Sequence, residues 1–310
     1  MTDMQDQTAP SAAATGLLGD KTVRRIGFGA MQLAGPRVIG PPSDPAEARA
    51  VLRRAVELGV DHIDTAQYYG PDTVNELIRE TLHPYPENLK LATKIGARRD
   101  REGNWLPAAS PRELREAVEE NLRTLGIERL DLVNLRQVSD DPDDAAPVAE
   151  GLATLAELRE EGKVDLIGVS GVGRGVLEAA LELVDLAAVQ NSFSIIDQAD
   201  RETLELCRER GLAYVPFFPL GSAFTGGPAA LAADAAIAGV AAKHGASPSQ
   251  VALAWLLALY EGVLLIPGTS SVAHLEENLA AAELELDPED MATLQGVEQL
   301  GDPMARMQHA

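Results

Sequence analysis

Eight short apolar runs alternate with amphipathic segments along this chain, and that alternation constrains its fold more than any other feature. The runs cover residues 26–28, 62–64, 89–94, 130–135, 166–170, 188–190, 213–217 and 264–266. Short apolar runs separated by helical patterns are typical of parallel strands, because each parallel strand needs a helical crossover to the next. Eight such units predict an α/β protein with a closed (β/α)8 TIM barrel, and a doubly wound open sheet is the alternative.

The helical segments carry start and stop signals. Four of them begin with a capping residue, then a proline, and then an acidic or amide residue two places further on. The cap accepts hydrogen bonds from free backbone N–H groups, and proline suits the first helical position. The four caps are Asp44, Ser110, Ser247 and Asp287. Helix ends are predicted where glycine follows a periodic segment. These glycines are Gly59, Gly126, Gly162 and Gly211.

Length and composition fit one such barrel. The chain has 310 residues, of which 45% are hydrophobic, and a domain of this size buries roughly three quarters of its unfolded surface. We expect a single domain over residues 21–300, a disordered tail over 1–20 and a short tail over 301–310. The single cysteine, Cys207, leaves no internal disulfide, and no pair of histidines has zinc-ligand spacing. We therefore expect no bound metal.

The charge of the chain restricts its partners. A formal net charge of −22 at pH 7 repels nucleic acid and anionic membrane surfaces. No apolar run is long enough to span a membrane, and the first residues lack the pattern of a signal peptide. The sequence predicts a cytoplasmic protein that is a monomer or a small homo-oligomer and binds a small molecule.

Polar residues at predicted strand ends are candidates for chemistry, since the carboxyl ends of barrel strands form the active-site face. Asp64 closes the second run, Lys94 closes the third, and Tyr69 lies on the loop after Asp64. Neighbouring strands lie about 4.8 Å apart, so Asp64 and Lys94 are within reach of an ion pair. A cation beside a phenol favours its ionised form, which makes Tyr69 a better general acid. A structural salt bridge with a tyrosine at its rim is the alternative.

Two long connections follow strands at the same face. They cover residues 97–109, after the third run, and residues 220–230, after the seventh. Long loops in a compact domain are usually functional. We therefore expect both loops to shape a ligand pocket.

Several motifs resemble the aldo-keto reductase superfamily. They are Asp64-Thr65-Ala66 followed by Tyr69-Gly70, and residues 27–31, 92–96, 167–170, 189–191 and 266–271. More narrowly, residues 29–36, 94–99 and 214–221 resemble the bacterial pyridoxal reductases of that superfamily. The resemblance covers about residues 21–297. It implies a barrel enzyme that reduces an aldehyde or ketone with NADPH, with NADH less favoured, and an aldehyde such as pyridoxal as substrate.

The resemblance also implies roles for four residues. Tyr69 donates the proton to the substrate carbonyl, and Asp64 and Lys94 support it. The fourth catalytic position holds Arg136, where the superfamily usually has histidine. Arginine stays charged and only donates hydrogen bonds, so it can orient a carbonyl oxygen but cannot relay a proton.

Further positions are implied in binding. Ser170 and Gln190 match contacts to the nicotinamide carboxamide, and Phe217 matches the aromatic that stacks on its ring. Gly171 stands where asparagine is common. The pyrophosphate loop is matched by Leu220, Gly221 and Ser222, and the adenosine end by Gly268, Thr269, Ser270, Ser271, His274, Glu277 and Asn278. Gly268 and His274 replace a common lysine and arginine, so the NADPH preference is expected to be modest. Met31 and Trp105 are weaker candidates for substrate contact.

Two other interpretations stay open at this point. A regulatory protein that binds the cofactor with little turnover is the main alternative, and Arg136 supports it. A lyase that forms a Schiff base on Lys94 is disfavoured, because Asp64 would keep the amine charged. A Rossmann dehydrogenase is nearly excluded, since residues 171–176 fail the Gly-x-Gly-x-x-Gly motif at its last position. Simpler structural roles for Gln190 at a strand end and Ser271 as a helix cap also remain.

Overall fold

The computed structural model describes residues 15–100, 102–138, 144–222 and 225–301. A curled parallel sheet lies at its centre. In spatial order its strands are β10 (Ala213–Tyr214), β9 (Ala188–Gln190), β8 (Val164–Ser170), β7 (Leu130–Arg136), β5 (Lys90–Arg99), β4 (His62–Asp64) and β3 (Phe28–Gly29). Each strand pairs in parallel with its neighbour along this path. This order follows the chain, as a (β/α)8 barrel requires.

The barrel is closed by the segment around residues 263–265. Val263 forms a parallel bridge with Tyr214, and Leu265 forms one with Ile26. Backbone hydrogen bonds of 3.0 Å from Leu264 N to the Tyr214 carbonyl and of 2.7 Å from Leu265 N to the Arg25 carbonyl complete the junction. The eighth apolar run therefore closes the barrel through single bridges, where the sequence predicted a regular strand. The closed barrel itself is confirmed, and the open doubly wound sheet is excluded.

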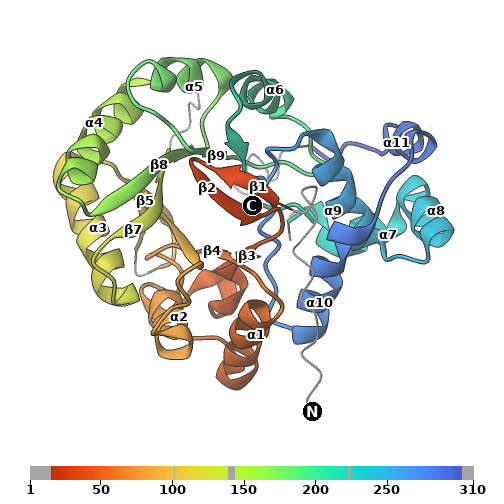
Figure 1. Ribbon diagram of the computed structural model, residues 1–310, viewed down its shortest axis with the longest axis horizontal. Coiled ribbons are helices and arrows are strands. Elements are labelled where there is room, and N and C mark those ends of the chain that lie inside the picture. The colour runs from red at the N-terminus through yellow and green to blue at the C-terminus, as the bar shows by residue number, and fades with distance from the viewer. Residues whose placement is uncertain (1–14, 101, 139–143, 223–224, 302–310) are drawn as a thin grey trace, which may run out of the picture.

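Helices surround the strands, as Figure 1 shows for α1 to α6. Their bounds are α1 (Pro45–Glu57), α2 (Thr73–Leu82), α3 (Pro111–Leu125), α4 (Ala146–Glu160), α5 (Arg174–Leu181), α6 (Arg201–Arg210), α9 (Pro248–Leu259) and α10 (Val272–Ala280). Three further helices gather at one side of the molecule in Figure 1: α7 (Gly227–Ala233), α8 (Ala235–His244) and α11 (Pro288–Leu294). Short 3-10 turns lie at Ala30–Leu33, Pro36–Val38 and Ala281–Glu283.

The predicted helix boundaries are confirmed. The side chains of Asp44, Ser110, Ser247 and Asp287 each accept a hydrogen bond from a backbone N–H in the first turn of α1, α3, α9 and α11. The last three form complete capping boxes. Gly126 and Gly211 end α3 and α6 in the left-handed conformation, with φ of 69° and 68°. Local sequence therefore sets where these helices begin and end.

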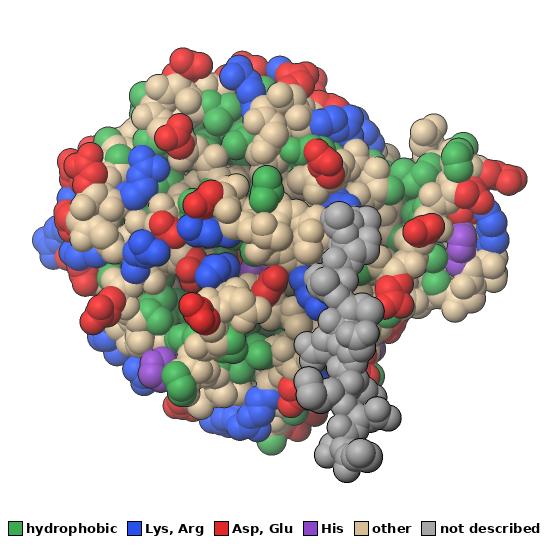
Figure 2. Space-filling view, in the orientation of Figure 1, with side chains coloured by type: hydrophobic (Ala, Val, Ile, Leu, Met, Phe, Trp, Pro, Cys, Tyr) green, Lys and Arg blue, Asp and Glu red, His purple; other side chains and the backbone are tan. Residues whose placement is uncertain are grey.

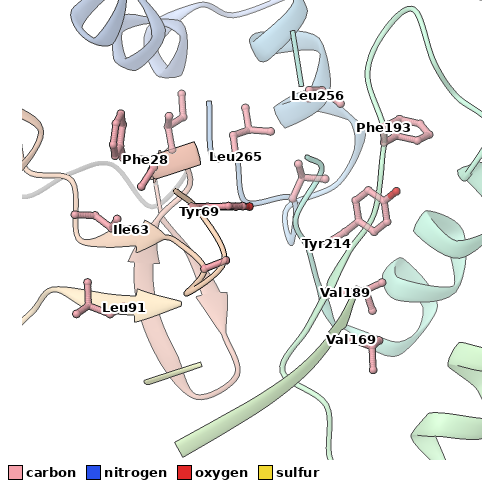
Figure 3. Packing of buried hydrophobic residues seen from close by; sticks show 14 of the residues in the cluster. Phe28, Ile63, Tyr69, Leu91, Val169, Val189, Phe193, Tyr214, Leu256 and Leu265 are labelled. Carbon is pink, nitrogen blue, oxygen red and sulfur yellow. The ribbon is translucent and has the colours of Figure 1, made fainter. Parts of the chain in front are cut away.

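Two apolar layers result from the alternation of side chains along each strand. Outward-facing residues, including Ile63, Leu91, Val169 and Val189 in Figure 3, belong to the large cluster that joins the strands to the helices. Inward-facing residues such as Ala92, Leu132 and Val215 form a smaller cluster inside the barrel. Cys207 is buried on α6, as expected for a packing residue. The interior cluster has few large side chains, which leaves room for polar groups near the active-site end.

An N-terminal hairpin closes one end of the barrel. It consists of β1 (Thr15–Leu18) and β2 (Lys21–Arg24), which pair antiparallel, and it lies across the barrel in Figure 1. Leu18 and Val23 join the interior cluster. The expected disordered tail over residues 1–20 is therefore wrong for residues 15–20. A two-stranded hairpin is hard to detect in sequence because it is stabilised by packing against the barrel. Residues 1–14 and 302–310 lie outside the described residues.

Both long connections contain regular structure. After Lys94, β5 continues to Arg99 and turns into β6 (Trp105–Ala108), which pairs antiparallel with it. The expected loop over 97–109 is therefore largely a hairpin. In the second connection, α7 begins at Gly227, before the expected loop end near residue 230. Acidic and basic side chains are interspersed over the face in Figure 2. Among the described residues, no helix is long and apolar enough to cross a membrane.

Candidate active site

Asp64 and Lys94 form a buried ion pair inside the barrel. The Lys94 ammonium donates to Asp64 Oδ1 and to the Thr65 carbonyl oxygen at 3.0 Å. The lysine is 5% exposed and the aspartate 3%. An uncompensated charge at this depth would be strongly unfavourable, so each charge requires the other. The expected contact between the ends of β4 and β5 is present.

A polar network outside the barrel anchors the same strand ends. Thr65 Oγ1 donates to Asn75 of α2 at 2.8 Å, and Asn75 donates to Asn121 of α3 at 2.9 Å. Thr93, next to Lys94, also donates to Asn121, at 2.6 Å. All are buried. This network, which sequence patterns did not reveal, fixes the backbone on either side of the ion pair.

Tyr69 lies on the loop between β4 and α2. Its ring belongs to the large cluster that also holds Phe28 and Leu265 (Figure 3), and the Lys94 ammonium lies 5.0 Å from the ring centroid. Burial raises the pKa of Tyr69 well above 10, Asp64 raises it further, and Arg136 lowers it. The phenol is therefore neutral at ordinary pH. Arg136 thus adds a second positive charge near the phenol, beside the Lys94 ammonium to which the sequence analysis had assigned this effect.

Arg136 ends β7 and points across the mouth of the barrel. Its guanidinium donates to Ser170 Oγ at 3.1 Å and lies over the Phe217 ring, 4.9 Å from the centroid. Ser170 is the register partner of Arg136 and of Gln190. The fold thus brings together three residues that the sequence assigned to the nicotinamide and one assigned to the substrate carbonyl.

Gly171 leaves the space that Arg136 uses. Its φ is +72°, and a Cβ built there would lie 2.9 Å from Arg136 Nη1 and 3.1 Å from Cζ. A side chain at this position would push against the guanidinium and strain the backbone. Arg136 and Gly171, the two positions at which the sequence departs from the pattern it resembles, are therefore linked by contact.

Gln190 connects the residues predicted to bind nicotinamide to the ion pair. Its Nε2 donates to Asp64 Oδ2 at 2.8 Å, so both carboxylate oxygens of Asp64 accept a hydrogen bond. The simpler role of satisfying a strand end does not describe Gln190, which is 1% exposed and reaches across the barrel from β9 to β4.

A second buried network supports the turn after β8. Asn191 accepts from the backbone N–H groups of Gly171 and Val172 at 2.7 and 3.2 Å and donates to Asp200 at 2.8 Å. Tyr214 donates its hydroxyl to the same carboxylate at 2.6 Å. Burial raises the pKa of Asp200 to about 6, although the hydrogen bonds it accepts lower it. This network positions the turn against which Arg136 packs.

The two weaker substrate candidates lie at different places near the barrel mouth. Trp105 of β6 packs edge-on against Tyr68, at 5.2 Å between centroids, and Tyr68 packs edge-on against Tyr69 at 5.5 Å. Arg99 stacks on the other side of this aromatic row, 4.2 Å from the Trp105 ring. Trp105 thus supports Tyr69 through Tyr68. Met31 is half-buried on the 3-10 turn after β3.

The pyrophosphate candidates lie on the loop after β10. Ser222 is buried, and its backbone N–H donates to Thr225 Oγ1 at 2.9 Å. Gly221 adopts a φ of +76°, and Leu220 is half-buried. Thr225, which the sequence analysis did not select, therefore helps to shape this loop.

The adenosine candidates cluster at the start of α10. Ser271 occupies the cap position without a side-chain hydrogen bond to the helix. Its N–H donates to Thr269 Oγ1 at 3.1 Å, and the Val272 N–H donates to Glu47 of α1 at 3.1 Å. Glu47 is a negative charge that sequence patterns did not place there. Ser270 and His274 are exposed, and Gly268 is half-buried.

Two residues further along α10 are engaged within the protein. Glu277 accepts a hydrogen bond from Ser247, the cap of α9, and its carbonyl oxygen accepts from Gln250 at 3.1 Å. Asn278 is 4% exposed. Glu277 thus links α10 to the beginning of α9. A ligand bound by Glu277 would share its carboxylate with the Ser247 hydroxyl.

The barrel mouth combines the parts of a proton-donating carbonyl site. A buried neutral phenol from the loop after β4 lies beside an ion pair from β4 and β5 and a guanidinium from β7. A phenol and a guanidinium can both donate hydrogen bonds to a carbonyl oxygen as it gains negative charge. An aromatic face and polar side chains from β8 and β9 lie next to them.

Comparison with known proteins agrees with a site for carbonyl chemistry. Residues 25–299 match the sequence profile of the Aldo/keto reductase family. The chain is 49% identical over 282 residues to pyridoxine 4-dehydrogenase of Escherichia coli, which covers 90% of this chain and 96% of that protein.

Solved structures agree on the fold. A thermostable aldo-keto reductase in complex with the inhibitor epalrestat is 28% identical, with a TM-score of 0.74 over 90% of this chain and 98% of that one. An aldo/keto reductase from Klebsiella pneumoniae, in complex with NADP and acetate, has a TM-score of 0.73 over 91% and 94% of the two chains. At 24% identity this likeness concerns the fold alone.

Proposed function

This chain belongs to the aldo/keto reductase family, and from that premise we propose that it reduces pyridoxal to pyridoxine with NADPH. The observation that carries the proposal is the meeting of Tyr69, the Asp64–Lys94 pair and the Arg136 guanidinium at one end of the barrel. The 49% identity to a pyridoxine 4-dehydrogenase supports the substrate class. The single buried cysteine agrees with a cytoplasmic protein.

The reaction assigns a separate task to each residue. Tyr69, kept protonated by burial, donates its proton to the carbonyl oxygen. Arg136 stabilises the Tyr69 phenolate that remains and also donates a hydrogen bond to the carbonyl oxygen of the substrate. Lys94 holds a positive charge against the face of the phenol, and Asp64 fixes that charge in place. The nicotinamide, when bound, supplies the hydride.

The residues at the barrel mouth fit a nicotinamide. The face of Phe217 already accepts a planar cation, the Arg136 guanidinium, and the same guanidinium donates to Ser170. An oxidised nicotinamide ring is also planar and cationic, and such rings stack well on aromatic faces. Ser170, Gln190 and Phe217 would hold the ring, with the loop of Leu220, Gly221 and Ser222 next to the pyrophosphate.

The preference for NADPH over NADH is proposed to be modest. Thr269, Ser270 and Ser271 lead into α10, and a helix N-terminus favours a phosphate. The Glu47 carboxylate, however, already accepts the Val272 N–H there. The Glu47 carboxylate and a 2′-phosphate would compete for the N-terminus of α10, so Glu47 weakens the binding of a 2′-phosphate there.

Replacing Glu47 tests this competition. Glu47→Gln is expected to strengthen NADPH binding about two- to five-fold, the size of one charge at a helix end, and to leave NADH binding nearly unchanged. Ser270→Asp should act in the opposite direction. Glu57→Gln, the same charge change at the far end of α1, is the control. Titration of each variant with both cofactors decides the matter, and equal effects on NADPH and NADH would contradict the proposal.

A substrate panel tests the proposed function itself. Purified protein is assayed with pyridoxal, benzaldehyde and an aliphatic aldehyde, each with NADPH and with NADH. We expect the highest kcat/KM for pyridoxal with NADPH. Tight cofactor binding without turnover of any aldehyde would instead favour the regulatory alternative, for which the replacement of histidine by Arg136 is the supporting observation.

A further inference from the structure

A small cavity lies inside the barrel next to the Asp64–Lys94 pair. Its polar lining residues are His62, Asp64, Asn134 and Gln190, and its apolar ones are Leu18, Ala92, Leu132, Val215, Leu264 and Ile266. The cavity leaves about 10 Å³ for the centre of a water molecule. A cavity that just fits one water leaves almost no volume for the centre of that water, so this space is sufficient for a water molecule and far too small for a substrate.

Three of the polar side chains offer atoms that have no hydrogen-bond partner among the described residues. They are both amide atoms of Asn134, Oε1 of Gln190 and Nε2 of His62. Asn134 is fully buried, and the other two are at most 4% exposed. Buried polar groups are nearly always hydrogen-bonded, to protein or to ordered water. Together these atoms supply both donors and acceptors to one small space.

The neighbouring strands carry glycine where these side chains need room. A Cβ at Gly168, the register partner of Asn134 on β8, would overlap Asn134 Oδ1. A Cβ at Gly27 would overlap the His62 ring. The polar side chains therefore lie against bare backbone, and the barrel interior has space for them only because of these two glycines.

We propose that this cavity holds one buried water molecule, and that Asn134, through this water, is a positioning residue for Gln190 and the Asp64–Lys94 pair. Asn134 Nδ2 donates to the water, and the water donates to Gln190 Oε1. A carboxamide whose oxygen is held in this way keeps its Nε2 directed at Asp64, where the hydrogen bond is 2.8 Å long. Asn134 is also the register partner of Lys94 on the adjacent strand.

Crystallography of the full-length protein without ligands tests the water directly. At a resolution that orders water molecules, we expect one water within hydrogen-bond distance of Asn134 and Gln190. An empty cavity, or an Asn134 carboxamide bonded directly to Gln190, would overturn the proposal. This outcome does not depend on the proposed reductase function, so the two can fail separately.

Two substitutions of Asn134 test the positioning role. The measured quantity is the rate of aldehyde reduction, so this test rests on the proposed function. Leucine keeps the branched shape of asparagine and replaces its amide atoms with larger methyl groups, which fill the cavity and exclude the water, so Asn134→Leu is expected to lower kcat about three- to ten-fold, the effect of one hydrogen bond. Alanine leaves room for a second water that restores the link to Gln190, so Asn134→Ala should stay within about twofold of wild type, by the same reasoning.

The order of the two variants, read together with the melting temperature of each, separates positioning from packing, because overpacking by leucine would lower stability as well as kcat. If Asn134 only filled space, alanine would be the more damaging change, because it leaves the larger cavity. Thr81→Val, which removes another buried unpartnered hydroxyl on α2 outside the barrel, is the control and should leave kcat unchanged. An alanine variant as impaired as the leucine variant would refute the positioning role, and the crystal structure stands if either variant fails to fold.

Discussion

Tyr69→Phe is expected to lower kcat for aldehyde reduction by ~10²–10⁴-fold, the usual effect of losing a general acid. The substitution removes only the hydroxyl, so the contact of the ring with Lys94 and Tyr68 is kept. Binding of NADPH should therefore be nearly unchanged. Steady-state rates with pyridoxal measure the first quantity, and fluorescence titration with NADPH measures the second.

The neighbouring tyrosine provides a matched control. Tyr68 is also buried, and its ring packs between Trp105 and Tyr69. Tyr68→Phe removes a hydroxyl from the same loop and should retain most of the activity. A Tyr69→Phe protein with more than about half of the wild-type rate would remove this residue from the mechanism.

Arg136→His is expected to lower kcat/KM for pyridoxal far more than for benzaldehyde. Pyridoxal carries a phenolic oxygen beside its aldehyde, and that oxygen tends to be anionic near neutral pH. A guanidinium can donate to both oxygens at once, whereas histidine cannot. The loss of a charge-assisted hydrogen bond predicts a gap of roughly 1.5–3 kcal/mol between the two substrates. Arg98→His, at an exposed position on β5, is the control.

The Arg136 guanidinium can also be displaced without replacing the arginine itself. Gly171→Ala would place a methyl group 2.9 Å from Arg136 Nη1, so it should reproduce the selective loss for pyridoxal. Gly162→Ala is the matched control, because Gly162 has a similar φ of +78° and no heavy atom within 4 Å of the added Cβ. Equal losses for pyridoxal and benzaldehyde in Arg136→His would make the arginine a general catalytic or structural group.

Local features of the sequence predicted a large part of this structure. Capping residues, helix-ending glycines and the order of apolar runs each act over a few residues, and the capped helices and most of the barrel strands lie where these signals placed them. The parallel order of strands also followed, because helical crossovers leave few ways to connect eight short strands. The meeting of Asp64, Lys94 and Tyr69 needed only neighbouring strands in register.

Other features depended on contacts between distant segments. Thr15–Leu18 forms a strand because it packs beneath the barrel, and residues 263–265 close the sheet through single bridges to two different segments. Asn134 alternates with Leu132 and Arg136 along β7, so its inward direction was available from the sequence. The sequence could not show that Asn134 lies beside Gly168 without a hydrogen-bond partner among the described residues, because this depends on the register between β7 and β8.

By itself, the sequence determined the barrel, the helix boundaries and the residues at the strand ends, since these follow from periodicity and from the chemistry of single positions. Only the tertiary structure decided which groups act on one another. It placed Arg136 against Gly171, Ser170 and Phe217, where its charge lowers the Tyr69 pKa, and it set Glu47 at the start of α10. Charge and steric effects act through space over a few ångströms, and separation along the chain does not predict them.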